Sequence, residues 1–189
     1  MTLRFTRYTE EIDEATAPPR PIGRRYALTL SVTALLLVSC FMQMARGHAD
    51  PLARANAAYA RGDFVQVVNI LTPLALQGSP KAQAFLGFMF EHGYGAPQAY
   101  VAAADLYVQA SMQGNPFGQA MLGLMYNKGH GVPQDFVLAY KWLNLAAARA
   151  QRSERDYFLR LRDAVASKMS PYQIAEGQRL AALWAVGMP

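Results

Sequence analysis

An internal repeat of 36 residues constrains the fold of this chain more than any other feature of its sequence. Residues 82–114 align without a gap on residues 118–150, and twelve of the aligned positions are identical. These positions include the pairs Gln83/Gln119, Ala84/Ala120, Leu86/Leu122, Gly87/Gly123, Met89/Met125, Gly93/Gly129, Gly95/Gly131, Pro97/Pro133 and Ala103/Ala139. A repeat of this period is typical of a protein built from copies of one supersecondary unit, each stacked on the next.

Each repeat has the pattern of two helices joined by a Gly-x-Gly-x-Pro loop. In the first helix, apolar residues recur at i, i+4, i+7 and i+8 between Ala82 and Phe90, which places them on one helical face. In the second helix they recur at i, i+3, i+4 and i+7 between Ala103 and Ala110. The loop glycines permit the positive φ at which a helix ends, and the proline prevents that helix from continuing. Because neither hairpin can bury its apolar face alone, the sequence predicts an all-α stack of helical hairpins.

The repeated residues resemble the Sel-one-like repeat (SLR) family, a branch of the tetratricopeptide superfamily. Its pattern is A-x-x-x-L-G-x-x-Y-x-x-G-x-G-V-P-x-D-x-x-x-A-x-x-W-x-x-x-A, and the second unit follows it from Leu122 to Ala146, with Gly118 at the first alanine. The first unit departs from the pattern at four positions, with residues that are compatible with packing: Phe90, Ala96, Ala99 and Leu106. The resemblance implies a right-handed α-solenoid whose first helices line a concave side that binds partners.

The chain extends this stack at both ends. Upstream, the sequence resembles a shorter tetratricopeptide-like hairpin that turns at Gly62 and Asp63. Downstream, a solenoid must cover its last apolar face, and Ser170 followed by Pro171 marks the start of a covering helix. We therefore predict one tetratricopeptide-like hairpin, two SLR units and a C-terminal helical cap, at residues 50–81, 82–117, 118–151 and 152–189.

Composition narrows the functions that such a stack can have. The chain of 189 residues is 52% apolar and 16% charged. From Asp50 onward it has 12 basic and 9 acidic residues, a difference of +3, which is too even to indicate nucleic-acid binding. Cys40 is the single cysteine, so the chain has neither an internal disulfide nor the two thiolates of a Cys-based zinc site. The predicted domain must therefore be stabilised by helix packing.

The N-terminal residues predict export from a bacterial cytoplasm. Residues 1–23 have four acidic residues within residues 10–14, then three prolines and few large apolar side chains, which is typical of a disordered tail. Arg24 and Arg25 then precede residues 26–45, a run of twenty uncharged and mostly apolar residues. Such a run forms an apolar helix long enough to span a membrane, and the preceding arginines favour a cytoplasmic N-terminus.

Three alternatives stay open for residues 24–49. They form an inner-membrane anchor, or a signal peptide that is cleaved before Asp50, or a lipoprotein signal. The last alternative depends on Cys40, which ends a Leu-Val-Ser-Cys sequence that resembles a lipobox. All three place residues 50–189 in the cell envelope, either facing the periplasm from the inner membrane or released into the periplasm.

No side chains with catalytic or metal-binding spacing emerge from the sequence. His92 and His130 lie 38 residues apart, and no cysteine or acidic partner recurs at ligand spacing, so we interpret them as exposed or capping histidines. The segment from Gly93 to Gly95 lacks the third glycine of a dinucleotide-binding fingerprint. Asp63 and Asp135 precede helices and are interpreted as N-caps. We predict a protein without catalysis, metal or cofactor; the alternative is a cell-wall hydrolase or modifying enzyme that uses the solenoid as its substrate groove.

Basic residues gather near the start of the predicted cap. They are Arg149, Arg152, Arg155, Arg160 and Arg162, and the acidic residues Glu154, Asp156 and Asp163 are interleaved with them. Mixed charges at helical spacing predict a solvated face with internal ion pairs. The alternative is a contact with an acidic partner or with lipid headgroups.

Positions that differ between the two repeats are the candidates for recognition, because identical positions are explained by the packing that both units share. On the first helices, four such pairs stand out: Phe85/Met121, Phe88/Leu124, Glu91/Asn127 and His92/Lys128. We predict that these eight residues line a groove in which an adaptor of the cell envelope binds another protein or peptide. The alternative is that the apolar members pack against a neighbouring helix.

Overall fold

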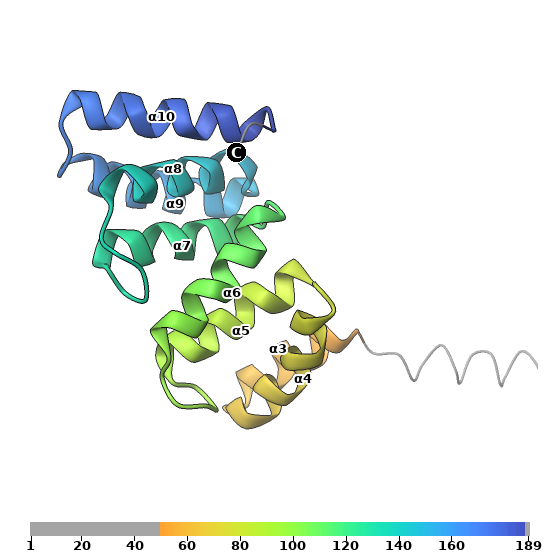
Figure 1. Ribbon diagram of the computed structural model, residues 1–189. Helices are drawn as coiled ribbons and strands as arrows, with labels where there is room; N and C mark the ends of the chain where they lie inside the picture. The colour runs from red at the N-terminus through yellow and green to blue at the C-terminus, as the bar shows by residue number, and fades with distance from the viewer. Residues whose placement is uncertain (1–49, 188–189) are drawn as a thin grey trace, which may run out of the picture. The chain divides into compact units, whose positions relative to one another are not determined.

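The computed structural model describes residues 50–187, which form a stack of α-helices without a β-strand (Figure 1). The helices are α3 (Pro51–Ala60), α4 (Phe64–Leu76), α5 (Pro80–His92), α6 (Tyr100–Met112), α7 (Pro116–Lys128), α8 (Phe136–Arg149), α9 (Arg152–Ala166) and α10 (Pro171–Ala185). Consecutive helices from α3 to α9 pack on one another. The predicted all-α solenoid of helical hairpins is therefore confirmed.

The predictions for the N-terminal segment fall outside the described residues. They concern the tail at residues 1–23, the export segment at residues 24–49 and the lipidation of Cys40. Within residues 50–187, every helix is too short or too polar to cross a membrane.

Polar side chains begin the helices at the positions that the sequence predicts. The carboxylates of Asp63 and Asp135 accept hydrogen bonds from the backbone N–H three residues further on, at 3.2 and 2.9 Å. Ser170 and Gln173 form a capping box at the start of α10. These bonds satisfy amide groups that the first turn of a helix leaves without a partner, so both aspartates are N-caps.

Glycine in the first helix of each unit brings the two helices of the hairpin together. A Cβ atom at Gly87 would lie 2.9 Å from the Tyr107 ring, and one at Gly123 would lie 3.0 Å from the Ala139 carbonyl oxygen. Both distances are shorter than a normal van der Waals contact. This close approach seats α5 on α6 and α7 on α8.

The loop of each unit rests on the second helix of the unit before it. Gly131 has a φ of 70° and leaves no space for a Cβ against the carbonyl group of Tyr100, where α6 begins. Gly95 has a φ of 72° and makes the same contact with Phe64, where α4 begins. Both the glycines and their contact residues are 36 apart, so the sequence repeat is also the repeat of the stack.

A glutamine in each loop satisfies the end of the first helix. The side-chain amide of Gln98 donates a hydrogen bond to the Glu91 carbonyl oxygen at 2.8 Å. Gln134 donates the equivalent bond to the Asn127 carbonyl oxygen, also at 2.8 Å. Carbonyl groups in the last turn of a helix lack partners within the helix. This capping explains why glutamine stands where a dinucleotide-binding fingerprint would require glycine.

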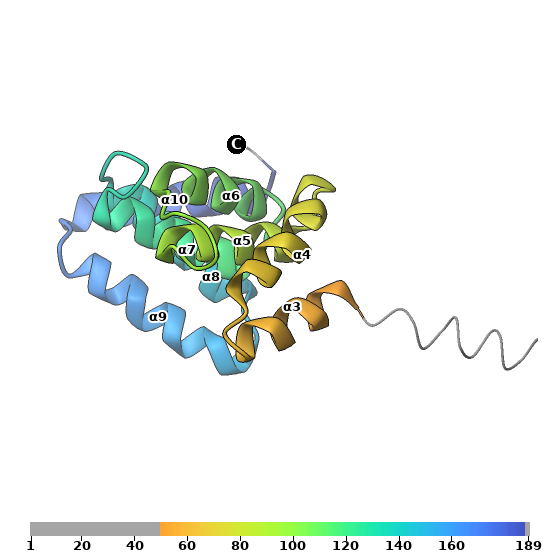
Figure 2. The same ribbon diagram turned by 90° about the horizontal axis from the view of Figure 1, so that it is seen from below.

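The last two helices, α9 and α10, both pack on α8. Phe158 and Val165 are the buried residues of α9, and Ala181 is buried in α10. Trp184 of α10 meets Trp142 of α8 edge to face, with ring centroids 5.8 Å apart. Figure 2 shows α9 lying on the same side of α5 and α7 as α3 does. We call this side of the stack the inner side.

The predicted pairing of the arginine cluster is wrong for most of its members. Arg162 pairs with its neighbour Asp163 at 2.7 Å, and Arg149 instead lies over the Trp184 ring, 4.4 Å from its centroid. Three arginines form no ion pair within residues 50–187; they are Arg152, Arg155 and Arg160. All three are exposed on α9, where ion pairing contributes little because water solvates both partners.

Candidate functional site

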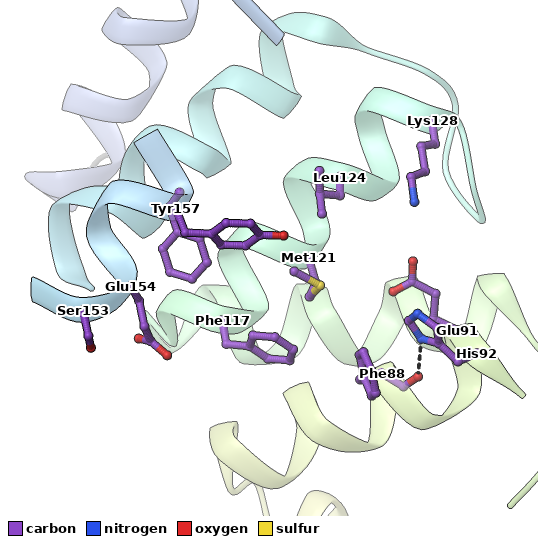
Figure 3. A pocket seen from close by; sticks show the side chains of 11 residues that line it. Phe88, Glu91, His92, Phe117, Met121, Leu124, Lys128, Ser153, Glu154 and Tyr157 are labelled. Carbon is purple, nitrogen blue, oxygen red and sulfur yellow. Dashed lines mark hydrogen bonds between the residues drawn. The ribbon is translucent and has the colours of Figure 1, made fainter. Parts of the chain in front are cut away.

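Helices α5, α7 and α9 surround a pocket of about 530 Å³ on the inner side of the stack (Figure 3). Its lining consists of Phe88, Glu91 and His92 from α5, Phe117, Met121, Leu124 and Lys128 from α7, and Ser153, Glu154, Tyr157 and Phe158 from α9. We name it the α9 pocket, because α9 supplies the wall that the repeat does not provide.

A second pocket of about 650 Å³ adjoins the first. The two share Phe117 and Glu154, and the second continues past Phe85 and Lys81 to Leu52 of α3. We name it the α3 pocket and call the two pockets together the inner groove. The inner groove thus extends from α3 along α5 and α7 to α9.

The walls of the α9 pocket are largely apolar and aromatic. Phe88, Phe117 and Leu124 are half-buried, whereas Met121 is only 9% exposed. The rings of Phe88 and Phe117 lie 6.2 Å apart with an interplanar angle of 53°. Tyr157 is 48% exposed and projects from α9 over the pocket (Figure 3). The pocket therefore offers apolar surface that water can reach and that a ligand would bury.

One end of the α9 pocket carries a buried carboxylate. Glu91 is 8% exposed, and its Oε2 accepts a hydrogen bond from the Tyr107 hydroxyl at 2.9 Å. Burial raises the pKa of Tyr107 far above its ordinary value, and the negative charge of Glu91 raises it further, so this hydroxyl stays protonated as a donor. In Figure 3, Lys128 extends toward Glu91 from α7. No ion pair within 4.0 Å joins the two among the described residues.

The structure brings most of the predicted groove residues together. Six of the eight line the α9 pocket: Phe88, Glu91, His92, Met121, Leu124 and Lys128. Phe85 lines the α3 pocket instead, where its ring packs on Tyr59 with centroids 5.5 Å apart. Asn127 lines neither pocket; its side-chain oxygen accepts a hydrogen bond from Lys168 at 3.0 Å.

The comparison of the two repeats misses the part of the pocket that lies outside them. Ser153, Glu154, Tyr157 and Phe158 belong to α9, which lies outside the two aligned blocks. Phe117 lies one residue before the aligned block, and the residue 36 positions earlier is Lys81. Extending the alignment by one residue would therefore have identified Phe117 as a position that differs.

His92 and His130 make different contacts in the structure. His92 is exposed, and its ring lies 4.2 Å from that of Phe88 and bonds through Nδ1 to the Phe88 carbonyl oxygen at 3.0 Å. His130 is half-buried, and its ring packs on that of Tyr100 with centroids 4.5 Å apart and an interplanar angle of 39°, so the prediction of an exposed or capping residue is wrong for it. Residues 50–187 bring no three His, Cys, Asp or Glu side chains together as a metal site.

Comparison with known proteins identifies the repeat. The family described as "Sel1 repeat" matches residues 80–115 and residues 116–150. No curated protein matches the chain. Similar solved structures include c5321, described as a protective antigen of uropathogenic Escherichia coli with an SLR fold, at 26% identity and a TM-score of 0.63. The alignment covers 72% of this chain and 30% of c5321.

A Sel1 repeat protein from Oxalobacter formigenes is 28% identical with a TM-score of 0.49, over 55% of this chain and 44% of that protein. This chain thus spans less than half the length of either protein. Proteins with this repeat are generally scaffolds for protein interaction, and the repeat fold is typically non-catalytic. The chain therefore contains two consecutive Sel1 repeats, which place residues 80–150 in the Sel1-like repeat family.

Proposed function

We propose that this protein is a non-catalytic adaptor that binds a segment of another protein in the inner groove. The observation that carries the proposal is the α9 pocket, in which solvent-accessible aromatic and aliphatic side chains from α5, α7 and α9 converge. Much of this lining consists of residues that differ between the repeats. Packing of the repeat does not fix these side chains, so they can be specific for a partner.

The shape of the inner groove favours a peptide segment over a compact small molecule. Its two pockets, of about 530 and 650 Å³, adjoin at Phe117 and follow the stack across α3, α5 and α7. An extended segment can place one side chain in each pocket while its backbone stays solvated. Aromatic anchors in such pockets supply much of the affinity of protein interfaces.

Site-specific photocrosslinking in cells tests this proposal. A photoreactive phenylalanine analogue in place of Tyr157 should give a discrete crosslinked partner of the full chain. The same analogue in place of Tyr172, which is 80% exposed on α10 and outside both pockets, serves as the matched control. Leu124→Glu should abolish the adduct from position 157, because it places a charge on the apolar wall. Identical adducts from both positions, or an adduct that persists with Leu124→Glu, would refute binding in the inner groove.

We also propose that the adaptor works in the bacterial cell envelope. The support is the sequence of residues 24–49, with its arginines followed by twenty uncharged residues. Residues 26–45 then hold the protein at the inner membrane, or cleavage before Asp50 releases it into the periplasm, or Cys40 becomes the lipidated N-terminus that anchors it.

Accessibility of an introduced cysteine tests this location. Tyr172→Cys in a Cys40→Ala background should react with a membrane-impermeant maleimide in intact spheroplasts or in the periplasmic fraction. A cytoplasmic protein with an exposed cysteine, labelled only after lysis, is the control. Labelling of the introduced cysteine only after lysis would contradict the proposal. Metabolic lipid labelling that Cys40→Ala abolishes would establish the lipidated form, and absence of such labelling from the wild-type chain would exclude it.

A further inference from the structure

The carboxylate of Glu91 is only half satisfied by the described residues. Its Oε2 accepts the Tyr107 hydrogen bond, while its other oxygen accepts none from residues 50–187. Glu91 as a residue is only 8% exposed, but this second oxygen is not among the fully buried atoms that lack a partner, so it is open to the pocket and to water there. A carboxylate with so little hydration is stabilised further when a cation pairs with it. Glu91 lines the α9 pocket, so a ligand in that pocket can provide the missing partner.

The fold of the repeat does not require this charge. Thirty-six residues later, Asn127 occupies the position of Glu91, and Leu143 occupies that of Tyr107. The second unit therefore forms the same hairpin with neither member of the pair. A buried acid and its fixed donor are thus a specialisation of the first unit, placed where that unit faces the pocket.

The surroundings of Glu91 also favour a positive charge. Phe88, Phe117 and Tyr157 line the same pocket, and the faces of aromatic rings attract cations. The other charged or titratable groups at the pocket are Glu154 across from Glu91, His92 beside it and Lys128. Lys128 is exposed on a flexible side chain, so it can move aside at little cost when another cation arrives.

We infer that the α9 pocket takes a lysine or arginine side chain of the bound segment, whose positive charge pairs with the free oxygen of Glu91. This inference depends on the proposed function, because it specifies which segment the inner groove selects. A large apolar side chain next to the cationic one packs against Leu124 and Met121. Only one carboxylate oxygen is free, so the contact is made at a single point and suits lysine as well as arginine.

Selection from a random peptide library tests the inference. A phage library of linear dodecapeptides is panned in parallel on the full-length wild-type chain and on Glu91→Gln. The amide of glutamine still accepts the Tyr107 hydrogen bond but carries no charge. Wild-type protein should enrich peptides with Lys or Arg beside a bulky apolar residue, and Glu91→Gln should lose the basic preference. Asp156→Asn, at an exposed acid of α9 outside both pockets, should keep it.

Affinities of one selected peptide then provide a second test that does not depend on a protein variant. Replacing its basic residue with norleucine should weaken binding to the wild-type chain at least tenfold. The same replacement should change binding to Glu91→Gln less than threefold. Lys128→Met should tighten binding of the basic peptide, because it removes a like charge next to Glu91.

The outcomes separate the two proposals. Selected peptides that bind the wild-type chain, compete with one another and fail on Leu124→Glu, yet show no basic preference, overturn the role of Glu91 and leave the inner groove in place. A wild-type chain that selects no peptide overturns both. A basic preference that persists in Glu91→Gln also overturns the role of Glu91, as does weaker binding to Lys128→Met.

Discussion

A comparison of residues at equivalent positions of the two repeats distinguishes those that pack the stack from those that line the inner groove. Tyr94 stacks on Phe64 with ring centroids 4.7 Å apart, and 36 residues later His130 packs on Tyr100 at 4.5 Å with its ring tilted by 39°. His130 is therefore a packing residue at the position that Tyr94 occupies in the first unit. Glu91 has no such equivalent, because the second unit has an amide in its place.

Tyr107→Phe should lower the free energy of unfolding by about 1–3 kcal/mol, because the buried Glu91 carboxylate loses its donor. Urea unfolding of the full chain measures the change. Adding Glu91→Gln to Tyr107→Phe should restore part of this loss, since the charge is removed. Tyr157→Phe, at an exposed tyrosine of the α9 pocket, should change stability by less than about 0.5 kcal/mol. Strictly additive effects at positions 91 and 107 would contradict the coupling of the pair.

Helical periodicity explains how much of the candidate site the sequence predicts. Phe88, Glu91 and His92 share a face of α5, so residues chosen by spacing converge when the helices stack. Phe85 lies one turn earlier, next to α3, and therefore falls into the other pocket. Asn127 lies outside both pockets and instead accepts a hydrogen bond from Lys168, a contact between residues distant in the sequence that no local pattern encodes.

At the scale of helices and loops, the repeat accounts for the hairpins and their joints but not for α9. Caps, glycine contacts and loop lengths recur in the sequence, so they predict α5 to α8 closely. The buried stripe of α9, with Phe158 and Val165, indicates that one face is covered without indicating what covers it. Because a stripe of this kind fits many neighbours, the α9 wall of the pocket emerges only from the tertiary structure.

Gly131→Ala should be more destabilising than Gly62→Ala, although both glycines have a positive φ, of 70° and 78°. At Gly62 a Cβ meets nothing within 4 Å, so the cost is about 1 kcal/mol of backbone strain. At Gly131 the Cβ would also overlap the backbone at Tyr100, which adds about 1–3 kcal/mol. Chemical denaturation of both variants measures the difference. Equal losses would show that the loop does not press on the preceding helix.

For the molecule as a whole, the end of the stack is closed by α10 on α8. Trp142, Trp184 and Arg149 form one layered contact there, with Arg149 over the Trp184 ring. Arg149, near the end of the second repeat, thus contributes to this packing while its residue stays exposed. Helix α8 is covered by α10 and by one face of α9. Other residues of α9 line the inner groove.

Ending the chain at Met169 should expose the face of α8 that α10 covers. Tyr140 and Trp142, each at most 6% exposed, lie on α8 where α10 packs. We expect a lower midpoint of thermal unfolding and concentration-dependent association, because a large apolar face becomes accessible. Circular dichroism and light scattering measure the two effects. Tyr172→Ala, on the exposed side of α10, should change neither; a truncated chain that stays monomeric and equally stable would contradict the role of α10 as a cap.

The loop contacts at Gly95 and Gly131 give the protein a way to change length in evolution. Each unit meets its predecessor through the same glycine and the same helix start, so duplicating residues 80–115 would create a unit whose joints already fit. Such a gain would lengthen the inner groove by one unit and leave α9 beside the last repeat. The length of the inner groove can therefore change by duplication of a repeat. The side chains that α9 contributes to it can change separately, by point mutation.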